Sequence, residues 1–197
     1  MTWNEIRLAT LQKMFSSEGA AINEHDETVR EYLNAMPQAA REGADMLLAA
    51  GFGMRRTVIL LEDGGTRADL QSELPRLYAG DPLELYRLGP DGSLKPLAGA
   101  HLAAGRYLQV AGGGPVAAVY TPRPEPFGPA MPGDAAIQLR EEGAALLPLY
   151  MASQLYKDDD VTVSTQYRNE FEAALDRLRP GPAHPLGEAF CGVSGWV

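Results

Sequence analysis

The sequence predicts an α+β protein: a helical bundle formed by both chain ends, with an antiparallel, β-sandwich-like module inserted between them. Residues 1–52 and 135–180 place apolar side chains at helical spacing, whereas residues 53–134 hold short apolar runs separated by Gly and Pro. These runs recur at intervals of roughly ten to twenty residues, which suits an antiparallel sheet or small sandwich better than βαβ units. Residues 181–197 are expected to form a C-terminal docking tail.

The composition is that of an ordinary globular protein with an acidic balance. Of the 197 residues, 45% are hydrophobic and 22% are charged, so the chain can bury a core of its own. Its 26 acidic and 17 basic residues give a net charge of −9, which disfavours binding to nucleic acid through phosphate neutralisation. The same charge is compatible with the wall of a channel through which DNA passes without specific binding.

The single cysteine, Cys191, excludes an intrachain disulfide and a Cys-rich zinc site. The first residues lack the basic start and apolar stretch of a signal peptide, and no run approaches the ~18 apolar residues of a membrane span. We therefore expect a protein made in a reducing compartment, with no membrane association.

Two helices are expected in the N-terminal part. Thr2 and Glu5 fit a capping box at the start of the first helix, and residues 16–23 read as a loop. The second helix should begin near Asp26 or Thr28 and end at Gly51. Pro37 interrupts its pattern, so either a kink or two abutting helices are expected there.

The central part alternates strand patterns with turn signals. A segment at residues 69–78 reads as a short helix or an edge segment. Residues 121–134 hold too many prolines for a strand and should form an extended connector. Four strands are expected, at residues 57–61, 83–88, 106–110 and 116–120.

The C-terminal part is predicted to return to helix over residues 135–142 and to form an αα-hairpin over residues 146–178. Its first helix begins near Leu147, or earlier with a kink at Pro148. The joint between the helices, residues 157–160, is acidic, and either Thr162 or Ser164 is expected to cap the second helix.

This hairpin carries a family resemblance. The runs LLPLYMASQLYKDDD and TQYRNEFEAAL resemble the C-terminal helical hairpin of head-tail connector (neck adaptor) proteins of tailed phages and prophages. The runs EIRLATLQKMF and DETVREYLNAMP, and the SGW near the end, look like the corresponding parts of the same family. The matches cover about half of the chain, at both ends, and they are packing signatures.

The resemblance implies a structural virion protein of the phage neck, assembled in the host bacterial cytoplasm. Such connectors form homo-oligomeric rings, commonly twelve-fold, that dock under the portal protein, extend the DNA channel and receive the next neck or tail component. Residues 1–52 and 135–180 would then form the connector domain. The alternative is a binding module, in which the β-sandwich recognises a glycan or a host protein and the helices support it.

No arrangement of residues indicates an enzyme, and we predict no catalytic residue, cofactor or metal. The glycines at 112–114 lack the Lys and Ser/Thr of a phosphate loop and read as a turn. His25, His101 and His184 lie far apart in the sequence without a motif, and nothing in its surroundings activates Cys191. Three aspartates, Asp158, Asp159 and Asp160, lack EF-hand spacing. A solvated turn at an exposed or channel-facing edge is the expectation for them, ahead of a cation site.

Aromatic and charged residues supply the candidate docking positions. The aromatic candidates read either as core residues or as anchors between subunits, because aromatics dominate interface energetics. Arg168 and Glu172 are four residues apart on one helix, so they either pair with each other or reach a neighbouring protomer. The aromatic candidates are Trp3, Phe15, Phe190 and Trp196.

Overall fold

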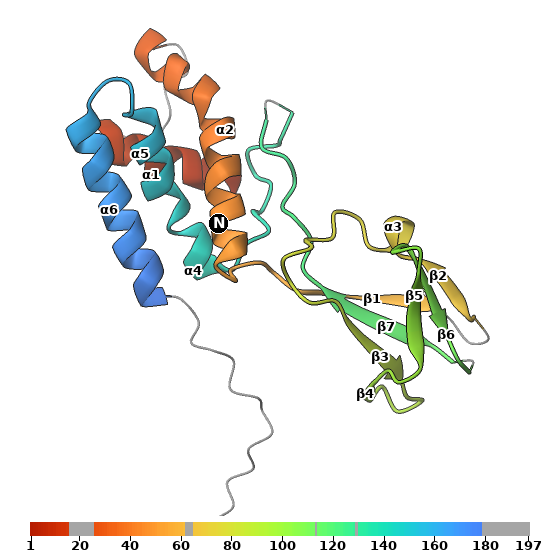
Figure 1. The fold of residues 1–197 in the computed structure, drawn as a ribbon. Coiled ribbons are helices and arrows are strands. Elements are labelled where there is room, and N and C mark those ends of the chain that lie inside the picture. The colour runs from red at the N-terminus through yellow and green to blue at the C-terminus, as the bar shows by residue number, and fades with distance from the viewer. Residues whose placement is uncertain (16–25, 62–64, 113, 129, 179–197) are drawn as a thin grey trace, which may run out of the picture.

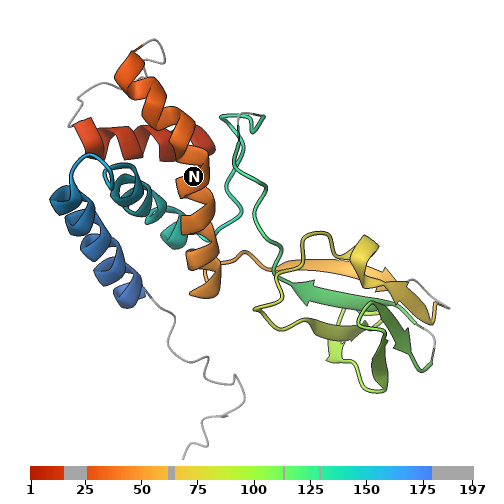
Figure 2. The ribbon, with the colours of Figure 1, turned by 45° about the horizontal axis from the view of Figure 1, so that its top comes forward.

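The computed structural model describes residues 1–15, 26–61, 65–112, 114–128 and 130–178. These residues form a mixed α+β fold with helices at both ends of the chain and two antiparallel sheets between them (Figure 1). The helices gather in one part and the strands in another, as both ribbon views show (Figures 1 and 2). The predicted fold class is confirmed.

Helix α1 (Trp3–Phe15) starts with the predicted capping box. The backbone N–H of Thr2 donates to Glu5 Oε2 at 2.8 Å, and the N–H of Glu5 donates to Thr2 Oγ1 at 3.3 Å. Two of the orphan amides at this helix start are thereby satisfied. The buried face of α1 consists of Trp3, Ile6, Thr10, Leu11 and Met14.

Helix α2 (Glu27–Ala49) is one continuous helix through Pro37, so the alternative of two abutting helices is wrong. Its ribbon bends along its length (Figure 1), as expected where a proline removes a backbone donor. The helix ends in a Schellman motif. Gly51, at φ 87°, donates to the carbonyl of Leu48, and Phe52 donates to that of Leu47.

The strands form two antiparallel sheets. The first has the order β1 (Arg56–Leu61), β7 (Val116–Tyr120), β3 (Glu84–Leu88) and β4 (Leu94–Pro96). The second has the order β2 (Arg67–Asp69), β6 (Tyr107–Val110) and β5 (Ala100–Ala103). Apolar residues of both sheets share one buried cluster, which includes Leu60, Val116, Leu108 and Val110. This is the packing expected of a small sandwich.

All four predicted strands are present, and three short strands, β2, β4 and β5, were not predicted. They are three or four residues long, too short for an alternating pattern to be read. Residues 69–78 were predicted to form either a short helix or an edge segment, and the structure contains both. Residue 69 ends the edge strand β2, and the single-turn helix α3 (Leu70–Glu73) follows it. Asp69 caps α3 by accepting the N–H of Gln71 at 3.1 Å.

The Pro-rich connector has no helix or strand in its described residues, as predicted. Phe127 of this connector is buried and packs on Trp3 with ring centroids 5.2 Å apart. The predicted return to helix at residue 135 is wrong by six residues, because helix α4 (Glu141–Ala144) starts only at Glu141. Two of the intervening residues form isolated antiparallel bridges to other segments, Ala136 to Thr2 and Leu139 to Gly53.

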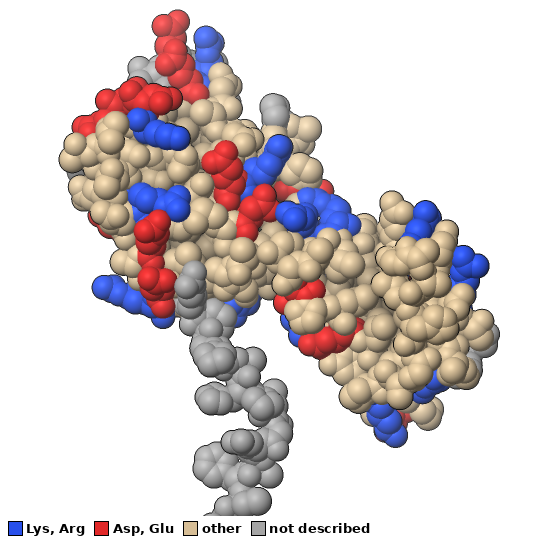
Figure 3. Space-filling view, viewed as in Figure 1, with Lys and Arg blue, Asp and Glu red and all other residues tan. Residues whose placement is uncertain are grey.

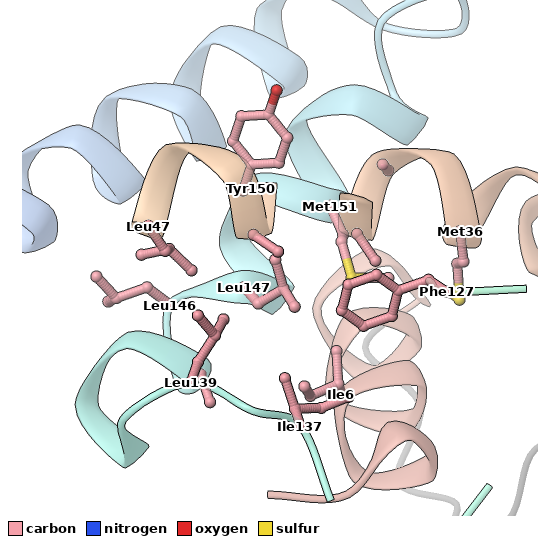
Figure 4. Packing of buried hydrophobic residues seen from close by; sticks show 14 of the residues in the cluster. Ile6, Met36, Leu47, Phe127, Ile137, Leu139, Leu146, Leu147, Tyr150 and Met151 are labelled. Carbon is pink, nitrogen blue, oxygen red and sulfur yellow. The ribbon is translucent and has the colours of Figure 1, made fainter. Parts of the chain in front are cut away.

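The αα-hairpin consists of α5 (Leu147–Leu155) and α6 (Val161–Leu178). Helix α5 begins at Leu147, with Pro148 in its first turn, where a missing N–H is tolerated. It is the central helix of the bundle and contacts α1, α2 and α6. Figure 4 shows side chains from α1, α2 and the segment before α4 gathered around Leu147 and Met151 of α5. The two chain ends therefore share one hydrophobic core.

Candidate functional site

The acidic turn between α5 and α6 is exposed, and two of its three aspartates have structural roles. Asp160 accepts the backbone N–H groups of Thr162 at 2.9 Å and Val163 at 3.1 Å, so it is the cap of α6. The predicted cap at Thr162 or Ser164 is wrong, because α6 already begins at Val161. Asp159 accepts the hydroxyl of Tyr32, on α2, at 2.5 Å.

The Asp159 contact changes the titration of Tyr32. A hydrogen bond to the carboxylate holds the tyrosine proton, and partial burial adds to this effect. Together they raise the pKa of Tyr32 from 10.0 to about 12. Asp158 takes part in neither contact and is exposed. Within the described residues, no group of three or more His, Cys, Asp or Glu side chains is arranged to hold a metal ion.

Two tyrosines of the hairpin hold the end of α1. Tyr156 and Tyr167 stack with centroids 6.1 Å apart and an interplanar angle of 11°. Their hydroxyls donate to the carbonyls of Met14 and Lys13, each at 2.5 Å. Carbonyls in the last turn of a helix lack intrahelical partners, so these bonds terminate α1 and fix it to the hairpin. Helical spacing indicated that both tyrosines face inward, but not what their hydroxyls bind.

Of the aromatic candidates for docking that lie in the described part of the chain, one is buried and one is partly exposed. Trp3 is 4% exposed and packs on Phe127, so in this fold it is a core residue and offers little area to a neighbour. Phe15 is 39% exposed and packs edge-on against Tyr32 at 5.5 Å. Phe190 and Trp196 lie outside the described residues, as do His25, His184 and Cys191.

Arg168 and Glu172 pair with each other along α6, at 2.6 Å from Nε to Oε1. The guanidinium of Arg168 also lies over the rings of Tyr150 and Phe171, at 5.2 and 5.9 Å from their centroids. Of the two alternatives, the pairing within the helix is the one that the single chain forms. Because Arg168 has carboxylate and aromatic partners within its own chain, it is poorly placed to reach a neighbour.

Among the described residues, none covers the outer face of α6. Helix α6 packs against α5 with Phe171 and Leu175 and lies at the edge of the bundle (Figures 1 and 2). A shallow groove runs along its first turns, where Val161 is 69% exposed. The other residues of this groove are Thr162, Thr165, Gln166, Asn169 and Glu170. A long helix with one uncovered, mostly uncharged face is available for side-by-side packing.

A cleft of about 580 Å³ lies between α1, α2 and the Pro-rich connector. Its lining includes two aromatic residues, Trp3 and Phe127, and three arginines, Arg7, Arg30 and Arg41. We call it the arginine cleft. No carboxylate is among the described residues that line it. Arg7 donates to Asn4 Oδ1 at 3.1 Å and Arg41 donates to the carbonyl of Phe127 at 3.5 Å, and both of these acceptors are neutral.

The arginine cleft could be predicted only in part. Arg30 and Arg41 share a helix face with the other α2 residues of the cleft, a spacing that the sequence already shows. Arg7 and Phe127 come from other segments, so only the tertiary structure adds them. The remaining α2 residues of the cleft are Leu33, Asn34, Pro37 and Gln38.

The β-module has a pocket of its own, of about 650 Å³, between α3, the segment that follows it and β5. Most of its wall is apolar, including Leu70, Leu74 and Leu102, and Leu102 is 51% exposed. Asp81 contributes a carboxylate that accepts the hydroxyl of Thr121.

The tyrosines of the sheets have intramolecular partners. Tyr120 is 1% exposed, and Tyr86 donates to Glu84 at 2.7 Å. Arg67 lies over the ring of Tyr107 at 4.1 Å. These rings therefore do not form an open platform on which a sugar ring would stack.

None of the helices in the described part of the chain is long and apolar enough to cross a bilayer. No protein-family model matches the chain, and no curated protein matches it.

Proposed function

We propose that this protein is a structural virion component, a head-tail connector or neck adaptor that forms a ring under the portal of a tailed phage or prophage. The observation that carries the proposal is that the two chain ends, whose sequences resemble this family, pack into one helical bundle around α5. Each subunit of a ring contacts two neighbours, so the bundle has to present two packing surfaces. The open face of α6 is one of them.

On this proposal the helices form the ring and the β-module lies outside it. Figures 1 and 2 show the β-module projecting from one side of the helical part. In a ring of such subunits, a projecting module would stay clear of a central DNA channel. The exposed acidic turn suits a channel or an outer edge, because negative side chains offer DNA phosphates no counter-charge. The portal and the next neck or tail component would contact the two ends of the ring.

The test is the mass of the purified full chain in solution, measured alone and with the portal protein of the same phage. We expect a closed ring, many times the protomer mass of 21.2 kDa, in at least one of the two samples. Removal of residues 190–197, which include Phe190 and Trp196, should abolish the ring or its docking. A matched control scrambles residues 181–188 and keeps the last residues. A protomer that ignores the portal would contradict the proposal.

The second candidate is a binding module, and the apolar pocket of the β-module favours it. Its occupant would be an apolar side chain of a host protein, since the tyrosines of the sheets have partners of their own. Leu102→Glu, which places a charge at the exposed rim of the pocket, would reduce that binding and leave the ring intact. Binding to host cells that survives this change would remove the pocket from consideration.

A further inference from the structure

We infer that the uncharged end of the sequence packs on the outer face of the first sheet of its own chain. The terminal segment is residues 189–197, which contain Phe190 and Trp196 and no charged side chain. A packed segment would still present its other side to a neighbour or to the portal, so the inference goes beyond the proposed function and does not depend on it. The apolar residues of the outer sheet face are Ile59, Tyr86, Leu88, Leu94, Pro96 and Val119.

The register of the strands defines the outer sheet face. Paired residues of an antiparallel sheet lie on the same side, and one row across all four strands consists of Ile59, Ala117, Tyr86 and Pro96. The adjacent row, on the opposite side, belongs to the buried cluster that the two sheets share, and it consists of Val58, Ala118 and Leu85. The row that contains Ile59 therefore points out of the sandwich.

The outer sheet face is apolar, although the described part of the chain leaves it uncovered. Ile59 is 53% exposed and Leu94 is 45% exposed, and none of the six apolar residues belongs to a buried cluster of the described residues. An antiparallel sheet with one solvated face normally places polar residues on that face. Apolar residues on both faces are typical of a sheet that is covered on both sides.

The charge of the outer sheet face matches that of the terminal segment. Among the register partners on this face, the charged residue is Glu84, which pairs with Arg55 at 3.0 Å and accepts the hydroxyl of Tyr86 at 2.7 Å. In the view of Figure 3, charged side chains are dense over the helical part and sparse over the β-module. An uncharged segment can pack on such a surface without the loss of ionic hydration that a charged one would suffer.

The size of the face favours a tethered segment over a separate protein. Four strands about 4.8 Å apart and up to about 20 Å long give a face of roughly 300 Å². A stable interface between separate chains buries about 800 Å² on each partner. A segment attached to the same chain needs less area, because it loses little translational freedom when it packs.

The terminal segment begins close enough to reach this face. Because α6 runs back along α5, its last turn lies at the end of the bundle where α2 leads into the β-module (Figures 1 and 2). At the same end, Gly143 of α4 packs on Phe52, and a Cβ added at Gly143 would lie 2.6 Å from Phe52 Cβ. Residues 179–188 join α6 to the terminal segment and span up to about 35 Å when extended. This span exceeds the length of the strands, so the segment can lie across the sheet.

The first test links the terminal segment to the face through the single cysteine of the chain, Cys191. Thr57→Cys adds a second thiol on the outer sheet face, where Thr57 is exposed and pairs with Val119. His101→Cys, at an exposed residue of β5 in the second sheet, is the matched control. A short bis-maleimide joins the two thiols of each full-length variant. Denaturing mass spectrometry then separates products of one chain from products of two chains.

The second test needs no added thiol. Ile59→Glu with Leu94→Glu places two charges on the outer sheet face, at side chains exposed enough to tolerate the change. Leu102→Glu, at a leucine of the second sheet that is similarly exposed, is the control. The rate at which Cys191 reacts with Ellman's reagent is measured in each chain. Far-UV circular dichroism checks that each variant is folded.

We expect Thr57→Cys to give the one-chain product at least about tenfold faster than His101→Cys, because packing holds the segment at the first sheet. Cys191 should react at least about tenfold faster in the double Glu variant than in the unmodified chain, because the packed segment would have to bury two new charges. The Leu102→Glu control should react as the unmodified chain does.

Equal linking at the two positions would overturn the inference. A Cys191 thiol that reacts equally fast in the unmodified chain and in the folded double Glu variant would also overturn it. Products that join two chains would show that the segment of another copy occupies the face, which makes the inference wrong and leaves the proposed function standing. If the double Glu variant does not fold, the linking result decides alone. A protomer that ignores the portal would overturn the proposed function, whereas the expected linking and reaction rates would stay the same.

Discussion

At the scale of single residues, the polar side chains of the helical part mostly hold its elements together. Tyr32, Tyr156 and Tyr167 each donate a hydroxyl hydrogen bond to a residue on another helix or at the α5–α6 turn. Asp160 uses its carboxylate to start α6. Much of the polar character of the hairpin is therefore structural.

Tyr32→Phe should lower the free energy of unfolding by about 1 kcal/mol at neutral pH. A hydrogen bond to a charged group is worth about 1.5 to 3 kcal/mol, and the value is reduced here because the pair is largely exposed to solvent. The measurement is urea unfolding of both chains. Tyr78→Phe is the control, because among the described residues the hydroxyl of Tyr78 has no hydrogen-bond partner. Equal losses in the two variants would contradict the prediction.

The same bond predicts a pH dependence. The pKa of Tyr32 is about 12 in the folded chain, above the ordinary 10.0 of the unfolded chain. A raised pKa in the folded state stabilises the neutral form, so the contribution is complete below pH 10 and is lost as the pH rises toward 12. The difference in stability between the parent chain and Tyr32→Phe should therefore shrink over that interval. A difference that stays constant from pH 9 to 12 would contradict the assignment.

At the scale of elements, the packing of α2 on α5 depends on a glycine. A Cβ atom added at Gly43 would lie 2.6 Å from Leu147 Cδ1 and 2.8 Å from Tyr150 Cδ1. Both neighbours are buried, at 0% and 5% exposed, so they have little room to move. Gly43 thus sets how near the two helices approach, and with it the position of the hairpin.

Gly43→Ala should destabilise the protein although alanine is the better helix former. The gain in helix propensity is about 1 kcal/mol, whereas overpacking a buried contact costs about 1 to 3 kcal/mol. We expect a net loss of about 1 kcal/mol, measured by thermal or urea unfolding. Gly128→Ala, where an added Cβ meets nothing within 4 Å, serves as the control and should change stability by less than about 0.5 kcal/mol. A Gly43→Ala variant that is as stable as the parent would show that the helices can move apart.

At the scale of the whole molecule, the β-module leaves and re-enters the helical part at one point. Arg56, which begins β1, is the register partner of Tyr120, which ends β7. Paired residues in an antiparallel sheet have Cα atoms about 4.5 to 5.5 Å apart. The helical part and the sheets also have separate buried clusters. A module attached in this way can be removed without stretching the chain that remains.

Replacing residues 56–120 with a short Gly-Ser linker should therefore leave a folded helical protein. Tyr78, which packs against the helical cluster, is the main packing partner that the helical part would no longer have. The expected result is a cooperative unfolding transition with the helical signal kept in circular dichroism, and rings that still form under the proposed function. A variant with the same linker inserted between β4 and β5, and nothing removed, controls for the linker. Loss of the helical signal on excision would show that the helices need the β-module.

The sequence by itself predicted the elements whose cause is local. The capping box at Thr2 and Glu5, the glycine end of α2, the four longer strands and the inward faces of the hairpin each follow from a pattern within one segment. Local patterns did not predict the structure where a helical pattern contained a proline or where a strand was very short. Thus α2 runs through Pro37 because packing outweighs one lost hydrogen bond, and β2, β4 and β5 are too short to show alternation.

Only the tertiary structure decided which distant side chains meet. Tyr32 and Asp159 are 127 positions apart, and the arginine cleft combines α1, α2 and the Pro-rich connector. The structure also places Trp3 in the core against Phe127. From the sequence alone, Trp3 could have been either a core residue or an anchor between subunits. The physical reason is that periodicity fixes which face of an element is buried but not which element covers it. That choice depends on how all the faces pack together, and it is made only when the chain folds.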